Sequence, residues 1–330
     1  MDSTSFLSFL PSWIILVVIA LFTIYFVARL LPKSKIDLKG KYVLITGCDR
    51  GFGRATARAL DKMGDCVLAT CLTKEGEQSL KSVTSEKLKT FQMDVTNSKQ
   101  IRDVYSEVRR EISSAGLWGL VNNAGIICCS PIEWTPLDDF KRSADVNLWG
   151  MIDVTKTFLP LLKKTPGRVV NLSSMLGRLT VPFYGAYCVT KYGVEAFSDA
   201  LRREMQPWGI KVSMLEPGAF LTDLISPASL EQQLRQRWNA LSDELKNDYG
   251  EEYLTRAVEL RNEAFRNLDI NEVVNTIVEA LMSSSPRDRY LVGQDAKNFL
   301  VWLTRLPTSV ADYVICASVK QLQPRGASVS

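Results

Sequence analysis

A β-strand, a glycine-rich turn and a helix follow one another early in the chain. The run 41–46 has the apolar and β-branched composition of a buried strand, and 54–60 has helical composition. Between them lie Gly47, Gly51 and Gly53. In this order, the backbone N–H groups of the turn and the N-terminus of the helix can surround a pyrophosphate. The spacing G-x-x-x-G-x-G differs from the common G-x-G-x-x-G fingerprint, so each glycine taken alone could equally mark a tight turn.

Strand-like and helix-like segments continue to alternate up to residue 291. Further apolar runs typical of buried strands lie at 66–71, 88–93, 120–121, 168–172 and 210–215. Longer segments with helical periodicity separate them. This alternation favours a parallel sheet with helices on both faces and right-handed crossovers. We therefore predict a single doubly wound α/β domain of the Rossmann type, spanning residues 36–295.

The composition excludes several classes of function. The chain has 330 residues, of which 46% are hydrophobic, which is enough for one large core without a second autonomous domain. The formal net charge of +4 comes from interspersed charges, so the sequence offers no basic stripe for nucleic acid. Seven cysteines without a C-x-x-C pair indicate neither a disulfide framework nor a zinc site. Because the sequence has no histidine, Ser-His-Asp hydrolysis and most catalytic zinc sites are excluded, and we expect no metal.

Tyr187 and Lys191 form a pair suited to catalysis. Positions i and i+4 share one face of a helix, so the ammonium group can sit beside the phenol and favour its ionised form. A free tyrosine, whose pKa is about 10, needs such help to act as a base at neutral pH. Ser174, thirteen residues before Tyr187, could hold the reacting oxygen by a hydrogen bond. The three residues suit the interconversion of an alcohol and a carbonyl, although an isolated Y-x-x-x-K is more often an ordinary surface pair.

Taken together, these motifs resemble the short-chain dehydrogenase/reductase family. The resemblance includes Asn122, Ala124 and Gly125 after the apolar run 118–121, and it extends in order and spacing from about residue 41 to residue 290. It implies an oxidoreductase with a Rossmann-type fold and a nicotinamide cofactor.

By this resemblance the catalytic residues are Asn147, Ser174, Tyr187 and Lys191. Tyr187 is the acid/base, and Lys191 lowers its pKa and holds the nicotinamide ribose. Ser174 positions the substrate oxygen, while Asn147 supports the proton relay. The residues implied to contact the cofactor are Thr46, Gly47, Gly51, Phe52, Gly53, Asp94, Val95, Asn122, Ala124, Gly125, Tyr187, Lys191, Pro217, Gly218 and Thr222. The glycines of the first turn would line the pyrophosphate, residues 94–95 would flank the adenine, and residues 217–222 would cover the nicotinamide.

The substrate class depends on the branch of the family. Several segments resemble the retinol and hydroxysteroid dehydrogenase branch, namely 45–49, 69–73, 117–125, 191–199 and 293–297. The segment 173–178 is more similar to 3-hydroxybutyrate dehydrogenase, a mitochondrial relative of that branch. Both interpretations stay open at this point.

The segment 179–186, just before the catalytic tyrosine, carries no charge, which suits a large apolar substrate. A short hydroxy acid would need a cation to pair its carboxylate in a dry pocket, and Arg178 is the nearest one. We therefore expect a lipophilic alcohol of retinoid or steroid type, with 3-hydroxybutyrate as the alternative. An alternative of another class is a catalytically silent membrane scaffold with a dinucleotide fold, and the intact set of four catalytic residues argues against it.

The cofactor prediction is NAD, with NADP as a possibility. In many NAD-preferring relatives an acidic residue at the end of the second strand binds the ribose 2′-OH, but here Cys71 and Leu72 stand at that place. Lys74 could meet a 2′-phosphate, and Glu75 beside it would oppose one. The preference for NAD therefore rests on the resemblance to the retinol branch.

The run 13–31 is almost continuously apolar and predicts a retained transmembrane anchor within residues 1–35. Its length is close to the roughly 20 residues that span a bilayer, and Trp13 and Tyr25 suit the interfaces. A cleaved signal or transit peptide fits less well, because the start is not basic and no cleavage site is obvious. Basic residues follow the run and none precedes it, which predicts a cytosolic catalytic domain. We expect the endoplasmic reticulum membrane, with a mitochondrial membrane as the alternative.

Two further segments are expected to shape access to the site. Residues 226–267 are charged and helix-rich, and they resemble the family's substrate-binding insertion. The tail 296–330 is apolar but interrupted by Arg305, Pro307 and Asp312, so it should pack on the domain or dip into the membrane interface. Membrane lipid is thus an expected partner and nucleic acid is not, while the resemblance allows a homo-oligomer.

Overall fold

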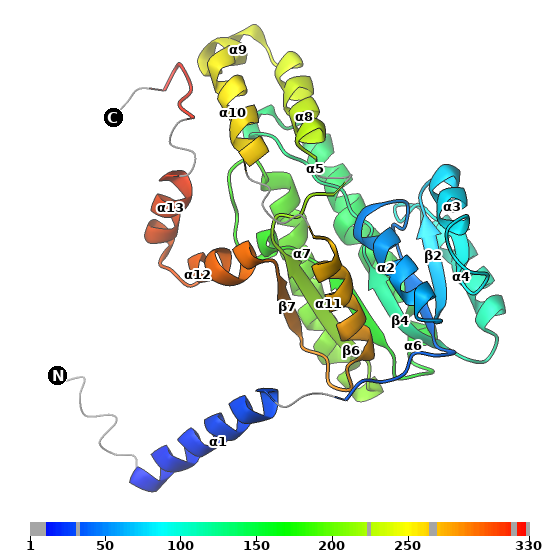
Figure 1. Ribbon diagram of the computed structural model, residues 1–330. Helices are drawn as coiled ribbons and strands as arrows, with labels where there is room; N and C mark the ends of the chain where they lie inside the picture. The colour runs from blue at the N-terminus through cyan, green and yellow to red at the C-terminus, as the bar shows by residue number, and fades with distance from the viewer. Residues whose placement is uncertain (1–10, 31–33, 223–225, 264–268, 318–321, 328–330) are drawn as a thin grey trace. The chain divides into compact units, whose positions relative to one another are not determined.

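The computed structural model describes residues 11–30, 34–222, 226–263, 269–317 and 322–327 (Figure 1). Parts of the predicted anchor, insertion and tail therefore lie outside the described residues, namely 1–10, 31–33, 264–267, 318–321 and 328–330. Contacts divide the chain into two units, one made of residues 1–36 with 283–285 and the other of residues 37–282 with 286–330.

The smaller unit contains helix α1 (Ser12–Leu30) and a short antiparallel bridge between Lys35 and Ser283. Large apolar side chains of α1 are exposed, among them Trp13 and Phe22. Among the described helices, none is both long enough and apolar enough to cross a membrane. The predicted transmembrane anchor is therefore not confirmed.

The larger unit is built on a sheet of seven parallel strands in the order β3-β2-β1-β4-β5-β6-β7 (Figure 1). The strands are β1 (Tyr42–Ile45), β2 (Cys66–Cys71), β3 (Lys89–Gln92), β4 (Leu117–Asn122), β5 (Arg168–Leu172), β6 (Lys211–Pro217) and β7 (Arg289–Val292). The predicted doubly wound parallel fold is confirmed. The strand order reverses between β1 and β4, and in such sheets ligands bind beyond the carboxyl ends of the strands at this point.

Helices cover both faces of the sheet (Figure 1). On one face α2 (Gly51–Lys62) packs against α11 (Asn271–Met282). On the other face the packed pairs are α4 (Ser98–Ile112) with α6 (Met151–Leu162) and α5 (Leu137–Ala144) with α7 (Gly185–Met205). The remaining helical elements between β1 and β6 are α3 (Lys74–Lys81), η2 (Ile132–Trp134), the π-helix η3 (Asp145–Gly150), η4 (Met175–Gly177) and η5 (Gln206–Trp208).

The core follows from the spacing of apolar residues along these helices. On α4 the buried positions Ile101, Val104 and Val108 recur at helical spacing and pack with Leu120 of β4 and Phe158 of α6. Burial of this apolar face, rather than intrinsic helix propensity, is what fixes α4 on the sheet.

The strand positions predicted from the sequence are correct to within a few residues, with one omission. Strands β2 and β5 begin and end as predicted, because each is a short run that is buried along almost its whole length. Strand β7 was not predicted. It has only four residues, which alternate between partly buried and buried, whereas β5, which also begins with an arginine, is buried throughout.

Three helices follow β6 in the insertion, namely α8 (Pro227–Asn239), α9 (Asp243–Tyr249) and α10 (Glu251–Glu263). The tail contains the π-helix η6 (Ala296–Leu300), α12 (Val301–Leu303) and α13 (Thr308–Ala317). Ala296 and Val301 form a small apolar cluster with Met175. The start of the tail therefore packs directly behind the loop that carries Ser174.

Candidate active site

A cavity of about 730 Å³ lies beyond the carboxyl ends of β1 to β6, at the point where the strand order reverses. Its walls come from the residues that end or follow these six strands. The predicted site residues that line it are Gly47, Gly51, Phe52, Asp94, Val95, Ala124, Gly125, Ser174, Tyr187, Lys191, Pro217, Gly218 and Thr222. The structure thus brings together groups that are as far as 175 residues apart in the sequence.

The turn between β1 and α2 has the geometry of a phosphate cradle. Gly47 and Gly51 have φ angles of +71° and +61°, in the left-handed region that favours glycine. A Cβ atom on Gly47 would lie 2.8 Å from the Cα atom of Ala124, so any side chain there would clash with the loop that follows β4. No side-chain hydrogen bond caps the N-terminus of α2, which leaves its first N–H groups to bind an anion. These residues fit the pyrophosphate of a dinucleotide.

Two residues predicted to contact the cofactor lie behind this wall instead. The Thr46 hydroxyl accepts hydrogen bonds from the backbone N–H groups of Asn123 and Ala124, both at 3.0 Å, and Thr46 is 2% exposed. A Cβ atom on Gly53 would lie 2.4 Å from the carbonyl oxygen of Gly47. Thr46 and Gly53 therefore join the loops that form the cradle and do not line the cavity.

Asn122 also lies away from the cavity. Its Nδ2 atom donates to the Thr155 hydroxyl at 2.9 Å and to Asn171 Oδ1 at 2.8 Å. The Asn122 side chain is therefore directed at neighbouring elements, and the expected part of Asn122 in shaping the nicotinamide side stays a prediction. The side chain ties β4 to β5 and α6, because a buried amide needs internal partners. The neighbouring Asn123, which does line the cavity, was not assigned a role from the sequence.

Tyr187 and Lys191 lie on successive turns of α7 and are both in the cavity wall. The Lys191 Nζ atom is 5.5 Å from the centre of the Tyr187 ring and donates to the Leu172 carbonyl at 2.7 Å. Ser174 Oγ accepts from the Leu176 N–H at 3.1 Å and donates to the Pro217 carbonyl at 3.4 Å.

Burial controls the ionisation of both groups on α7. It raises the pKa of Tyr187 above its ordinary value, and a hydrogen bond with Ser174 acts in the opposite direction. The expected net lowering of the tyrosine pKa by Lys191 is therefore not seen. Burial also lowers the pKa of Lys191 to about 8, although the nearby Glu195 carboxylate raises it. Both shifts have the same cause, since a buried site disfavours the charged form of either group.

Asn147 lies in the π-helix η3 and is 2% exposed. Its Oδ1 atom accepts from the Ile126 N–H at 2.7 Å, and its Nδ2 atom donates to the Ile126 carbonyl at 2.9 Å and to the Thr190 hydroxyl at 3.1 Å. Asn147 does not line the cavity; it connects the loop after β4 with α7 through Thr190. Single-turn π-helices are frequent at functional sites, and this one directs an amide into the space between two catalytic elements.

The sequence did not point to Asp49, which the structure places in the cavity wall. Its Oδ2 atom accepts from the Leu72 N–H at 2.8 Å, and its Oδ1 atom accepts from the Thr73 N–H at 3.0 Å and the Thr73 hydroxyl at 2.8 Å. A carboxylate thus stands against the end of β2, although it comes from the first turn. An acidic residue inside the glycine-rich turn was the available signal. The other unpredicted lining residues include Arg50, Thr73, Gly76, Thr96, Ile126, Ile127, Arg142, Ser173 and Phe220.

A large apolar cluster adjoins Tyr187. It contains Phe183 and Tyr184 before α7, Trp134 of η2 and Trp238 of α8, and it extends into α10. The rings of Trp134 and Trp238 are 5.4 Å apart. Aromatic side chains packed in this way form a rigid, desolvated surface beside the candidate acid/base.

Comparison with known proteins identifies the family. A family model described as short chain dehydrogenase matches residues 41–233. The chain belongs to the short-chain dehydrogenase family. Retinol dehydrogenase 16 of Mus musculus is 46% identical over 281 residues, which cover 84% of this chain and 88% of that protein. The human 17-beta-hydroxysteroid dehydrogenase type 6 is 44% identical over 286 residues, which cover 85% of this chain and 89% of that protein.

Solved structures agree with this membership. A short-chain dehydrogenase from Streptomyces avermitilis matches with a TM-score of 0.66 and 27% identity, covering 85% of this chain and 98% of that one. A short chain dehydrogenase from Burkholderia cenocepacia J2315, solved in complex with NADP, matches in fold with a TM-score of 0.63 and 21% identity, covering 88% and 100% of the two chains. The family prediction is confirmed, and the protein is an NAD(P)-dependent alcohol dehydrogenase.

Proposed function

We propose that this dehydrogenase interconverts the alcohol and carbonyl forms of a lipophilic substrate of retinoid or steroid type. The observation that carries the proposal is the apolar cluster beside Tyr187. Its aromatic residues come from η2, from the segment before α7, and from the helices α8 and α10. Of this cluster, Ile127 and Tyr187 line the cavity, so a polyene or a steroid skeleton beside Tyr187 would meet apolar surface that the buried aromatic residues support from behind. The names of the relatives, a retinol dehydrogenase and a hydroxysteroid dehydrogenase, support the same substrate class.

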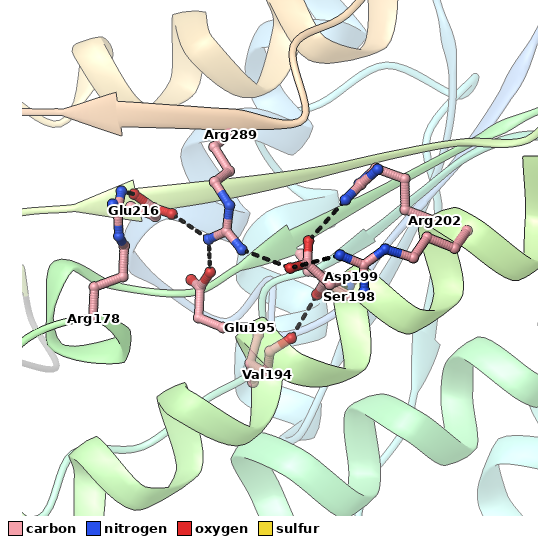
Figure 2. Close-up of polar contacts among 10 residues, drawn as sticks. Arg178, Val194, Glu195, Ser198, Asp199, Arg202, Glu216 and Arg289 are labelled. Atoms are coloured by element: carbon pink, nitrogen blue, oxygen red, sulfur yellow. Dashed lines mark hydrogen bonds and ion pairs between the residues drawn. The ribbon is translucent and has the colours of Figure 1, made fainter. Parts of the chain in front are cut away.

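The alternative substrate, 3-hydroxybutyrate, would need a cation for its carboxylate, and Arg178 was the candidate. Arg178 instead pairs with Glu216, whose carboxylate Oε2 atom is 3.1 Å from the guanidinium Nη1 atom (Figure 2). The Glu216 side chain is fully buried, so withdrawing Arg178 would remove a partner from a carboxylate shielded from water. This pairing disfavours the hydroxybutyrate alternative.

In the proposed mechanism, Tyr187 exchanges a proton with the substrate oxygen and Ser174 holds that oxygen in place. A nicotinamide cofactor held in this cavity, with its pyrophosphate at Gly47 and Gly51, would supply or accept the hydride. Because burial raises the pKa of Tyr187, its phenol is protonated at neutral pH, which suits proton donation to a carbonyl. In the oxidative direction the phenol must first lose its proton, and the Lys191 ammonium favours that ionised form. Asn147 would support the proton relay by holding the loop after β4 against α7.

A substrate panel with membrane-bound protein tests this function. The panel contains retinoids, hydroxysteroids and short hydroxy acids, each with NAD and with NADP. We expect turnover of at least one retinoid or steroid alcohol and little turnover of 3-hydroxybutyrate. Turnover of 3-hydroxybutyrate with no oxidation of any retinoid or steroid would contradict the proposal, and absence of all turnover would favour the silent scaffold.

NAD is the proposed cofactor, and Asp49 supports it. Three hydrogen bonds fix the Asp49 carboxylate against Leu72 and Thr73, at the end of β2 where the acidic residue of NAD-preferring relatives was expected. A negative charge there would repel a 2′-phosphate. Arg50 also lines the cavity and would attract one, but its side chain is exposed, so the fixed carboxylate should dominate.

Replacing Asp49 with asparagine should lower the preference for NAD over NADP about tenfold, because the substitution removes the charge. The asparagine has a similar shape but only one acceptor oxygen, so it can accept from only one of the Leu72 and Thr73 N–H groups. The measurement is the ratio of the two dissociation constants by fluorescence titration. Glu75→Gln is the matched control: the sequence suggested that Glu75 opposes a 2′-phosphate, but this residue of the first turn of α3 does not line the cavity, so the ratio should stay unchanged. A wild-type enzyme with tenfold higher kcat/KM for NADP would reverse the cofactor assignment.

We also propose that α1 attaches the enzyme to a membrane, with the endoplasmic reticulum as the expected location and a cytosolic catalytic domain. The exposed apolar side chains of α1 support attachment. Washing microsomes with carbonate should leave the protein in the pellet, whereas a variant that lacks residues 1–35 should be released. Protease added to sealed microsomes should digest the catalytic domain, and protection of the domain would contradict the cytosolic orientation.

A further inference from the structure

A cluster of charges, two of them buried and the others partly buried, lies on the side of α7 that faces β6 and β7. Arg289 of β7 contacts three carboxylates: Glu195 and Asp199 of α7 and Glu216 of β6 (Figure 2). Its Nη1 atom is 2.7 Å from Glu216 Oε1, and its Nη2 atom is 3.1 Å from Asp199 Oδ2. One guanidinium thus holds together carboxylates from two different elements, and Arg178 extends the cluster through Glu216.

Stability alone explains this cluster poorly. The side chains of Glu216 and Glu195 are 0% and 9% exposed, so their charges have been taken out of water. Apolar residues in such places are often at least as stabilising as ion pairs, because desolvation of the charges offsets their attraction. A functional group that needs a buried carboxylate nearby would account for the cluster.

That group is Lys191, which stands one helical turn before Glu195 and one turn after Tyr187 on the same face of α7. Glu195 also packs under η4, the element that follows Ser174: a Cβ atom on Gly177 would lie 2.9 Å from Glu195 Cγ and 3.0 Å from the Lys191 carbonyl oxygen. The carboxylate is thus enclosed between the catalytic helix and the loop that carries the catalytic serine.

Lys191 needs a nearby negative charge because it is a buried ammonium. Burial lowers its pKa to about 8, and Glu195 is the neighbour that raises it. Burial likewise raises the pKa of Glu195, and Glu216 adds to that effect, whereas Ser173 and Arg289 lower it. The charged and titratable groups around the pair are Tyr187 and Asp199 on α7, Glu216 on β6, Arg289 on β7 and Arg178 after η4.

We propose that Glu195, kept ionised by Arg289, is a positioning residue that keeps Lys191 protonated for cofactor binding and catalysis. The inference rests on the proposed function and on the role that the family resemblance implies for Lys191 at the nicotinamide ribose. Arg289 is in direct contact with Glu195, and Glu195 acts on Lys191 through space from the next turn of α7, while Lys191 itself donates to the Leu172 carbonyl.

The test is the pH dependence of NAD binding to the purified full-length enzyme, followed by fluorescence titration between pH 6 and 10. In the wild type, affinity should fall above about pH 8 as Lys191 loses its proton. In Glu195→Gln the loss should begin about one pH unit lower, since the substitution removes the carboxylate charge and keeps the shape. At pH 8.5 this displacement corresponds to roughly eightfold weaker binding relative to the wild type.

Asp199→Asn is the matched control, because Asp199 contacts the same guanidinium but lies two turns beyond Lys191. It should change thermal stability without shifting the alkaline limb, that is, the pH range in which NAD affinity falls. Glu195→Asp keeps the charge and should retain the wild-type limb; if Glu195→Gln does not fold, Arg289→Lys and Arg289→Met replace it, and only the Met variant should move the limb. A wild type without an alkaline limb would refute the role of Lys191, whereas a normal limb that Glu195→Gln and Arg289→Met leave in place would refute the inference about Glu195 alone.

Discussion

Tyr187→Phe should reduce kcat by about 10²- to 10⁴-fold, the usual contribution of a positioned general acid or base. The substitution removes the phenolic oxygen that exchanges the proton with the substrate. The ring itself should stay in place, because Tyr187 packs against the apolar cluster with Phe183 and Trp134 and a phenylalanine fills the same space. NAD affinity and melting temperature should therefore remain close to the wild-type values.

The measurement combines steady-state turnover of the best alcohol substrate with NAD titration. Tyr192→Phe is the matched control, because Tyr192 lies on the same helix with 44% of its surface exposed and should leave both quantities unchanged. A Tyr187→Phe variant that keeps a tenth of the wild-type activity would show that another group moves the proton. Loss of NAD binding together with activity would instead indicate damage to the cofactor site.

Those parts of the structure that depend on a short local sequence pattern were predictable from the sequence. The strands β2 and β5 are buried runs, and the cradle between β1 and α2 depends on glycines that are visible as such. Tyr187 and Lys191 were recognisable because their spacing matches one turn of a helix. In each case the information lies within a few consecutive residues.

The contacts that the local sequence pattern did not reveal are those between segments far apart in the chain. Asp49 takes the place of an acidic residue at the end of β2 although it precedes that strand by 17 residues. The motif of Asn122 predicts a role at the cofactor, but the sequence does not reveal that its amide donates hydrogen bonds to Thr155 and Asn171 on neighbouring elements. Strand β7 is short and only alternately buried, and the carboxylates that compensate its Arg289 come from α7 and β6. A sequence pattern indicates which residues of one element are buried. Which residues of other elements they contact depends on the strand order of the sheet.

Lys191→Met should lower kcat by an amount similar to Tyr187→Phe and should in addition weaken NAD binding. Loss of a hydrogen bond to a charged group costs about 1.5–3 kcal/mol, which corresponds to about 10- to 100-fold in the dissociation constant. The methionine side chain has a similar length, and the lost contact inside the protein is the donation from Nζ to the Leu172 carbonyl. Together the two variants would separate the proposed role of Tyr187 in proton transfer from the proposed role of Lys191 in cofactor binding.

The pH dependence gives this second prediction its sharpest check. In the wild type, NAD affinity should decline as the pH rises through the Lys191 pKa of about 8, because the deprotonated amine no longer carries the charge. In Lys191→Met the affinity should be low and flat over the same range, since the titrating group is gone. The control is Lys156→Met, which removes an exposed lysine on α6 and should keep the wild-type curve. If Lys191→Met bound NAD as tightly as the wild type at pH 7, Lys191 would have no part in holding the cofactor, and its effect on turnover would have to act through Tyr187 alone.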